Sequence, residues 1–389
     1  MIRISQIIHG RGTVSGKMGG GALQSDDSAP SRRRGPVIFW NITARCNLAC
    51  KHCYQKSGPG LSAESELKRE EALRLIEDLA SIRVPVLLIS GGEPLLREDF
   101  WDLAGHARSM GINTALSTNG TLVTGDIAQR IKDAGIDYVG VSLDGATEKT
   151  HDALRGVAGS YRRSVAALEN CVRTGLPCGV RVTATRDNWR EIPALIDLSH
   201  RIGIQRFCVY WLVPSGRGRD IHTAQQVDSK AVTFILDTLY RAARDTDPEE
   251  MEFLTVDAPQ DAVYFLERLR EDDPGRYPDA EATLRLTAGC SAGNRVANID
   301  PFGNVYPCQF AQMQEFLIGN VKDRSFLEIW NDPSNPVLTV FRHMEQSVNG
   351  TCGSCSSREI CGLGCRVRAY ADSCNFSAED PLCPRLARE

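Results

Sequence analysis

The hydrophobic positions of this chain alternate between short apolar runs and longer segments with helical spacing. The apolar runs predict strands at Val37–Ile42, Val84–Ser90, Thr114–Ser117, Tyr138–Leu143, Gly179–Thr185 and Arg206–Leu212. The amphipathic segments predict helices at Leu67–Ala80, Phe100–Met110, Ile127–Ala134, Ser160–Thr174, Ile192–Ile202 and Val227–Ala243. Mostly apolar strands, each followed by an amphipathic helix, are typical of a parallel sheet covered by helices. We therefore predict an α/β fold, a partial (β/α)6 TIM-like barrel with its chemistry at the carboxyl ends of the strands.

The same pattern divides the chain into three parts. Residues 1–36 begin with a short apolar segment and continue as a glycine-rich, polar stretch that cannot bury a core. We expect a flexible N-terminal segment there, with a lid or docking arm over the substrate as the alternative. Residues 37–270 form the predicted barrel. Residues 271–389 are rich in cysteine and predict a small, separate metal-binding domain.

Composition narrows the class of protein. The 389 residues are 42% hydrophobic and 24% charged, as in ordinary globular proteins, and the net charge of −4 gives no basic excess for binding nucleic acid. No apolar run reaches the roughly 18 residues of a membrane span, and no signal-peptide core is evident. The fourteen cysteines of such a chain indicate metal ligands rather than disulfides. We therefore expect a cytoplasmic protein.

Three cysteines, Cys46, Cys50 and Cys53, follow the first predicted strand with the spacing C-x3-C-x2-C. Three thiolates this close can hold one small metal cluster, but four normally complete such a site. The missing ligand leaves an open coordination position, which is where metal sites carry out chemistry. A structural zinc site and a non-enzymatic iron–sulfur electron carrier are the alternatives, and both normally have four ligands.

Polar and glycine-rich turns follow the next three predicted strands. The second strand ends at Gly91-Gly92-Glu93-Pro94, where glycine lets the backbone approach a ligand and the carboxylate can accept an ammonium group. The third and fourth strands end in small hydrogen-bonding side chains, namely Ser117, Asn119, Ser142 and Asp144. Turn and helix-cap chemistry is the alternative for these four residues.

Arginines are placed to reach the same rim. Arg155 follows the fourth strand, Arg181 lies on one face of the fifth strand, and a glycine-rich loop after the sixth carries Arg217 and Arg219. Arginine can hold a carboxylate with two parallel hydrogen bonds, so this pattern favours an anionic substrate. A solvated surface loop is the alternative for the last two arginines.

The three-cysteine loop, with Tyr54 behind it, and the Gly-Gly-Glu-Pro turn resemble the signatures of the radical SAM enzymes. The resemblance implies that Cys46, Cys50 and Cys53 hold a 4Fe–4S cluster whose open iron binds S-adenosylmethionine (SAM). Reductive cleavage of SAM would then give a 5′-deoxyadenosyl radical. The resemblance also implies a cofactor shell of Tyr54, Gly91, Gly92, Glu93, Pro94, Ser117, Asn119, Ser142, Asp144 and Arg155, with Tyr54 against the adenine.

The C-terminal cysteines resemble those of a SPASM-type auxiliary domain. A β-hairpin is expected at 298–306, between Cys290 and Cys308. The resemblance implies one auxiliary 4Fe–4S cluster on Cys352, Cys355, Cys361 and Cys383. It implies another on Cys290, Cys308 and Cys365, for which no fourth ligand is evident, so we expect one or two auxiliary clusters. Structural zinc is the alternative here too, and Cys374 is a spare.

Residues 35–43, 151–156 and 215–218 resemble one branch of this superfamily, the enzymes of the siroheme-dependent haem and haem d1 pathways. The resemblance implies an iron-porphyrin substrate and a low-potential electron donor such as ferredoxin or flavodoxin. The favoured reaction is oxidative decarboxylation of two propionates of Fe-coproporphyrin III to vinyl groups, which gives haem b. Arg181, Arg217 and Arg219 would then be propionate clamps, and His222 or His343 could reach the porphyrin iron.

Two other activities stay open within the resemblance. One is removal of acetate groups from 12,18-didecarboxysiroheme, or the related haem d1 step. The other is maturation of a peptide by a SPASM-type enzyme, which normally carries a peptide-recognition domain before its first strand. Residues 1–36 are too short and too polar for such a domain.

Overall fold

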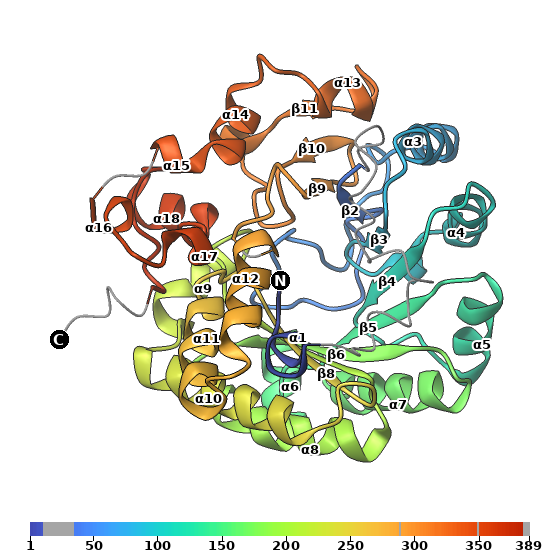
Figure 1. Cartoon of the computed structure of the whole chain (residues 1–389). Coiled ribbons are helices and arrows are strands. Elements are labelled where there is room, and N and C mark those ends of the chain that lie inside the picture. Colours follow the sequence, from blue (N-terminus) through green and yellow to red (C-terminus); the bar gives the residue numbers. More distant parts are fainter. Residues whose placement is uncertain (11–34, 288, 348–349, 384–389) are drawn as a thin grey trace.

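One sheet runs through the computed structural model, which describes residues 1–10, 35–287, 289–347 and 350–383 (Figure 1). The eleven strands follow the order β1-β8-β7-β6-β5-β4-β3-β2-β9-β10-β11. The central strands are β2 (Val37–Asn41), β3 (Leu87–Ser90), β4 (Thr114–Thr118), β5 (Tyr138–Ser142), β6 (Cys178–Ala184), β7 (Arg206–Trp211) and β8 (Glu252–Val256). Each of them pairs in parallel with the next, so their carboxyl ends meet on one rim.

Helices cover the outside of this curved sheet (Figure 1). The main ones are α3 (Arg69–Ser81), α4 (Phe100–Ser109), α5 (Gly125–Asp133), α7 (Ser160–Arg173), α8 (Ile192–Ile202), α10 (Ser229–Asp245) and α11 (Asp261–Asp272). Their apolar stripes and the outward-facing strand residues form the main hydrophobic core. The predicted α/β fold with a partial TIM-like barrel is confirmed.

Strand β8 was not predicted from the sequence. Its segment carries Glu252, a charged residue that interrupts the apolar pattern, yet this side chain is buried. Arg206 on the neighbouring strand β7 forms an ion pair with it inside the barrel. A charge can occupy a strand interior only when such a partner is supplied, and the partner lies 46 residues away in the sequence.

The first ten residues differ from the expectation of a flexible segment. Residues Ile2–Arg3 form β1, which pairs antiparallel with β8, and Ile4–His9 form helix α1 beside α10. Ile2, Ile4 and Ile7 are buried, so this short apolar segment covers the free edge of the barrel sheet. The glycine-rich and polar part of the expected segment, residues 11–34, lies outside the described residues.

The cysteine-rich part continues the barrel sheet. Strand β9 (Val296–Ile299) pairs in parallel with β2, and it forms the expected hairpin with β10 (Asn304–Tyr306), which pairs with β11 (Gly319–Asn320). Around it lie α12 (Tyr277–Thr287), α13 (Phe326–Trp330), α14 (Pro336–Arg342), α15 (Met344–Ser347), α16 (Gly350–Gly353), α17 (Arg358–Cys361) and α18 (Arg366–Ser373). The predicted boundary at residue 270 falls within α11, and the division into domains stays a prediction.

Short elements shape the rim of the barrel. The 3-10 helix η1 (Pro94–Leu96) follows β3, α6 (Glu148–Arg155) follows β5, and α9 (Gly218–Gln225) follows β7. Helix α6 begins where the Thr147 side chain accepts a hydrogen bond from the N–H of Thr150. In the described part of the chain, no helix has both the length and the apolar character needed to span a membrane.

Candidate active site

A cavity of about 1070 Å³, counted with its open mouth, lies at the carboxyl ends of the barrel strands. Twelve of the predicted site residues line it, namely Cys46, Cys50, Cys53, Tyr54, Gly91, Gly92, Ser117, Asn119, Ser142, Arg155, Arg181 and Arg217. Two further lining residues, Gln309 and Phe310, come from the segment directly after Cys308 in the C-terminal part. The fold therefore brings the three-cysteine loop, the turns at the strand ends and the segment after Cys308 together around one cavity.

The three-cysteine loop places its thiols on one wall of this cavity. Backbone N–H groups of Ala49 and Lys51 donate to carbonyls at the end of α6, and Arg217 donates through Nε to the carbonyl of Cys50 at 2.8 Å. Gly156, which ends α6 at φ +75°, lies so close that an added Cβ would be 2.6 Å from the carbonyl oxygen of Ala49. Glycine is required there both by the left-handed turn and by the approach of the loop.

The surroundings of the thiols suit a metal cluster. Burial raises the pKa of Cys46 to about 12, so the free thiol is protonated and must release its proton on binding metal. Polar donors lie nearby, with Asn119 Nδ2 3.8 Å from the sulfur of Cys46 and Arg155 Nη1 3.7 Å from that of Cys50. Among the described residues, no three His, Cys, Asp or Glu side chains converge as needed for a single metal ion. The three sulfurs line a wall instead, where a group larger than one ion has room.

The Gly-Gly-Glu-Pro turn packs against the chain that leads into the first cysteine. Gly92 N–H donates to the carbonyl of Thr43 at 2.7 Å, and an added Cβ on Gly92 would be 2.2 Å from the carbonyl oxygen of Arg45. The close approach that we expected of these glycines is thus made to their own chain as well as to the cavity. Pro94 is buried in η1 and does not line the cavity.

Glu93 is fully buried behind the cavity wall. Its carboxylate accepts hydrogen bonds from the hydroxyl of Thr118 and, at 2.9 Å, from the N–H of Asn119, which ties the end of β3 to the end of β4. Burial raises the pKa of Glu93 to about 7, although these donors oppose the rise. The carboxyl group therefore changes its charge near neutral pH.

Asp144 also lies behind the wall rather than on it. It forms an ion pair with Arg155 and lies 3.3 Å from Nε2 of His52, and both of these side chains line the cavity. Burial alone would raise the pKa of Asp144, but Arg155 and His52 outweigh it and the pKa is lowered. Asp144 is thus an anionic anchor for the two side chains in front of it.

His52 was missed in the sequence, although it stands inside the three-cysteine loop. Burial lowers its pKa to about 4, so the imidazole is neutral. Its Nδ1 atom is buried and has no hydrogen-bond partner among the described residues. Its position between Cys50 and Cys53 was the available signal.

A network of buried amides was missed as well. Asn41 donates to the hydroxyl of Tyr54 at 2.8 Å and accepts from Asn298 and Gln312 at 2.7 and 3.0 Å. The Tyr54 ring meets Phe310 edge to face at 5.6 Å. The network connects the segment after the three-cysteine loop with the C-terminal part. An asparagine within the apolar strand β2 was its only sign in the sequence.

Arg181 reaches across the barrel interior. Its guanidinium donates to the hydroxyl of Ser117 on β4, and it lies over Gly140, where an added Cβ would be 2.2 Å from its Nε. The neighbours that act on its charge are Tyr210, Tyr138, Cys208 and another arginine, Arg206. Within the described residues no carboxylate pairs with Arg181. A guanidinium enclosed without an anion is costly, so this position favours an anionic ligand.

The other predicted clamps and iron ligands lie elsewhere. Arg217 lines the cavity, but its Nε is engaged by the three-cysteine loop. Arg219 is exposed, contacts the sulfur of Met313 and lies outside the cavity, so the structure does not support it as a clamp. His222 lies near Arg368 and Asp372, His343 is exposed, and neither histidine lines the cavity.

The C-terminal cysteines fall into two groups. Burial raises the pKa of Cys308, and the neighbouring Cys290 and Cys365 raise it further. Burial likewise raises the pKa of Cys361 to about 12, and Cys383 and Cys352 add to the rise. Cys355 adjoins Cys352 in the same way. This grouping is the one that the SPASM resemblance implies, and the assignment of ligands stays a prediction. Cys374 is exposed, whereas Cys171, Cys178 and Cys208 are buried.

Comparisons with known proteins agree with this architecture. Residues 40–199 match the radical SAM superfamily, and residues 290–356 match the SPASM iron–sulfur cluster-binding domain. The Fe-coproporphyrin III synthase of Methanosarcina barkeri is 37% identical over 91% of this chain and 88% of its own. The pre-heme d1 synthase of Dinoroseobacter shibae is 37% identical over 91% of this chain and 87% of its own. The AdoMet-dependent heme synthase of Methanosarcina barkeri is 31% identical over 89% of this chain and 95% of its own.

A solved structure shares the fold. The structure of native anSMEcpe with bound AdoMet has a TM-score of 0.68 and 17% sequence identity, and it covers 90% of this chain and 94% of that chain. The cofactors of the present chain are accordingly a 4Fe–4S cluster with SAM and auxiliary iron–sulfur clusters. The chain belongs to the radical SAM superfamily with a SPASM-type C-terminal domain, and it is a SAM-dependent oxidoreductase.

Proposed function

We propose that this protein modifies the carboxylate side chains of an iron tetrapyrrole by radical chemistry. The observation that carries the proposal is Arg181, a guanidinium with no carboxylate partner among the described residues, in the cavity that also holds the three-cysteine loop. Tyr54, Phe310, Leu88 and Phe39 give the same cavity a largely apolar and aromatic lining. An anion-binding group in an apolar, aromatic cavity suits a flat macrocycle with acidic side chains.

The residue assignments follow from this proposal. Cys46, Cys50 and Cys53 hold the first cluster. The methionine part of SAM meets the cavity-lining residues Gly91, Gly92, Ser117, Asn119, Ser142 and Arg155, and Glu93 acts on its ammonium group from behind the wall. When bound, these cofactors supply a radical able to remove a hydrogen atom from an unactivated carbon. The protein binds the substrate, aligns the carbon and excludes water. Arg181 holds a propionate or acetate, and Asp144 supports the shell through Arg155 and His52.

Two reactions fit this site. In oxidative decarboxylation of Fe-coproporphyrin III, a propionate loses a hydrogen atom, its carboxylate leaves as carbon dioxide and one electron passes to an acceptor, for which an auxiliary cluster is suited. The 31% identical relative named heme synthase supports this reaction. Removal of acetates from 12,18-didecarboxysiroheme is the second candidate. The 37% identity to a Fe-coproporphyrin III synthase favours this reaction, and the 37% identity to a pre-heme d1 synthase favours the related haem d1 step.

One experiment tests the class and separates the two reactions. Anaerobically reconstituted protein is incubated with SAM, a reductant and either Fe-coproporphyrin III or 12,18-didecarboxysiroheme, and deoxyadenosine, carbon dioxide and tetrapyrrole mass are followed. Loss of carbon dioxide from the first substrate identifies the decarboxylase, and loss of acetate mass from the second identifies the alternative. Deoxyadenosine formation without a mass change in either substrate would contradict the tetrapyrrole proposal. A low-potential ferredoxin or flavodoxin, in the cytoplasm, is the proposed electron source.

SAM binding is expected to depend on the ionisation of Glu93. The pKa of this carboxyl is raised to about 7 by burial, and only the ionised form attracts the ammonium group of SAM. The affinity for SAM should therefore fall as the pH drops below 7, by up to about tenfold per pH unit. Equilibrium dialysis from pH 5.5 to 8.5 measures it. Glu93→Gln should bind SAM weakly without this pH dependence, while Asp102→Asn, an exposed control, should keep it. A flat wild-type profile would contradict the role of Glu93.

A further inference from the structure

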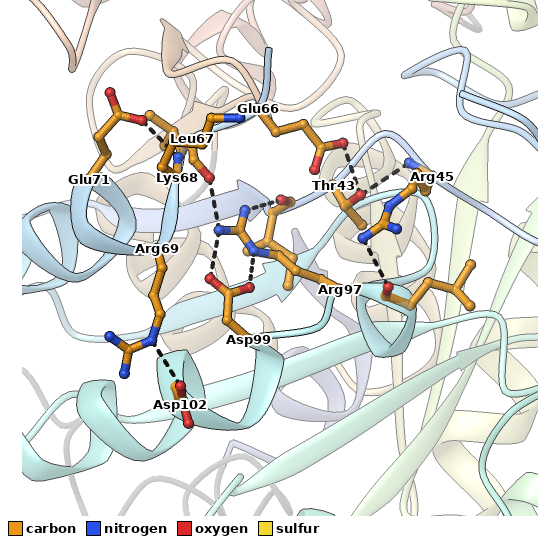
Figure 2. Close-up of polar contacts among 12 residues, drawn as sticks. Thr43, Arg45, Glu66, Leu67, Lys68, Arg69, Glu71, Arg97, Asp99 and Asp102 are labelled. Carbon is orange, nitrogen blue, oxygen red and sulfur yellow. Dashed lines mark hydrogen bonds and ion pairs between the residues drawn. The ribbon is translucent and has the colours of Figure 1, made fainter. Parts of the chain in front are cut away.

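Arg97 lies three residues after the proline of the Gly-Gly-Glu-Pro turn, at the end of η1, and only 7% of it is exposed. Its guanidinium lies where three separate segments of chain meet (Figure 2). The N–H groups of a buried guanidinium need hydrogen-bond acceptors from the protein because water cannot supply them. The acceptors of Arg97 therefore show which segments it connects. It was not identified as a site residue in the sequence.

The contacts of Arg97 join the two motifs of the SAM site. Nη1 donates to the carbonyl of Ile42 at 2.5 Å, at the exit from β2 that leads into the three-cysteine loop. Nη2 donates at 2.9 Å to the carbonyl of Leu67, where the chain returns from that loop to helix α3. Nε and Nη2 donate to the carboxylate of Asp99 at 2.6 and 3.1 Å, so the fork is held flat on its own segment (Figure 2).

A second set of contacts braces the same junction. Arg45, directly before Cys46, donates through Nη2 to the carbonyl of Leu96 at 3.1 Å. The buried carboxylate of Glu66 accepts a hydrogen bond at 2.9 Å from the hydroxyl of Thr43 (Figure 2). It also accepts one at 2.7 Å from the N–H of Ala44. The segment that enters the three-cysteine loop is therefore held by contacts on two sides. Arg97 is the residue that connects this segment, the segment leaving the loop and the Gly-Gly-Glu-Pro turn.

We propose that Arg97 is a positioning residue that sets the spacing between the three-cysteine loop and the Gly-Gly-Glu-Pro turn, and so shapes the seat of SAM. This rests on the proposed assignment of these two motifs to the cluster and to SAM. A planar fork with donors in several fixed directions is needed, because the acceptors belong to three different segments. Lysine keeps the charge but cannot bridge them in one plane.

The test is SAM binding to the reconstituted full chain, without any tetrapyrrole. Arg97→Lys should keep its iron content and yet raise the dissociation constant for SAM about 10- to 100-fold, as loss of a supporting contact around a metal site does. The change that SAM causes in the electron paramagnetic resonance spectrum of the reduced first cluster should need correspondingly more SAM. Asp99→Asn, which leaves the arginine in place but weakens its anchor, should shift the constant in the same direction by less.

Arg69→Lys is the matched control, because the ion pair of Arg69 with Asp102 lies on the exposed surface of the same region (Figure 2). It should bind SAM as the unchanged protein does. An unchanged dissociation constant in the iron-loaded fraction of Arg97→Lys would overturn the proposal, whatever happened to thermal stability, because a purely structural contact alters the amount of folded protein and not its affinity. Because SAM binding is measured without a tetrapyrrole, a negative tetrapyrrole assay does not affect this test. The role of Arg97 and the proposed substrate can therefore be refuted independently.

Discussion

Replacing Cys50 by alanine is expected to lower SAM cleavage more than about 10⁴-fold. The three cysteines act as one unit, so losing any one of them removes the catalytic effect of all three. Cys50 lines the cavity, and its sulfur lies 3.7 Å from Nη1 of Arg155. Two thiolates cannot hold a cluster that already has one open position. Deoxyadenosine formation with dithionite measures the effect, and the iron content should fall by one cluster.

Cys171→Ala is the control for this prediction. Cys171 is also fully buried, but it lies on α7 within the main hydrophobic core and outside the cavity. Its replacement should cost some stability and leave SAM cleavage and iron content per folded protein unchanged. Retention of the full iron content and SAM cleavage by Cys50→Ala would remove the three-cysteine loop from the site.

Replacing Arg181 by methionine is expected to separate SAM cleavage from substrate turnover. Methionine keeps the length and the apolar stem of the side chain but removes the only group proposed to bind the substrate carboxylate. Truncating one partner of a buried charge pair costs about 2–5 kcal/mol, so kcat/KM for the tetrapyrrole should fall about 30- to 4,000-fold. Deoxyadenosine should still form, because Arg181 does not contact the thiols. Equal loss of both products would contradict a role in substrate binding.

Gly140→Ala tests the same site without removing the charge. The new methyl group would occupy the space of the Arg181 guanidinium, which must move away from Ser117. We expect a smaller loss of turnover with the same pattern, together with a stability cost of about 1–3 kcal/mol for overpacking. Gly105→Ala is the control, because this helix position of α4 has open space around it and alanine is the better helix former. Normal turnover by Gly140→Ala would show that the position of Arg181 does not matter.

Much of the fold was predictable because its signals are local. Six strand and helix units follow from the period of the apolar residues, and the hairpin expected at 298–306 is the one formed by β9 and β10. The segments that escaped prediction have partners distant in sequence. Glu252 becomes a strand residue only through Arg206, and the short apolar segment at Ile2 to Ile7 is ordered only because the edge of β8 is free.

The site divides in the same way. The sequence alone determined the superfamily, and it predicted the cysteines that hold the clusters and the turns at the strand ends, because spacing and residue type carry that chemistry. It could not decide which polar side chains face the cavity. Only the tertiary structure placed Glu93 and Asp144 behind the wall, moved Arg219 outside it and brought His52 and Arg181 into it. Burial and pairing depend on where the chain folds back on itself, and no local pattern records that. For the same reason Arg97 became visible only where β2, the return to α3 and η1 meet.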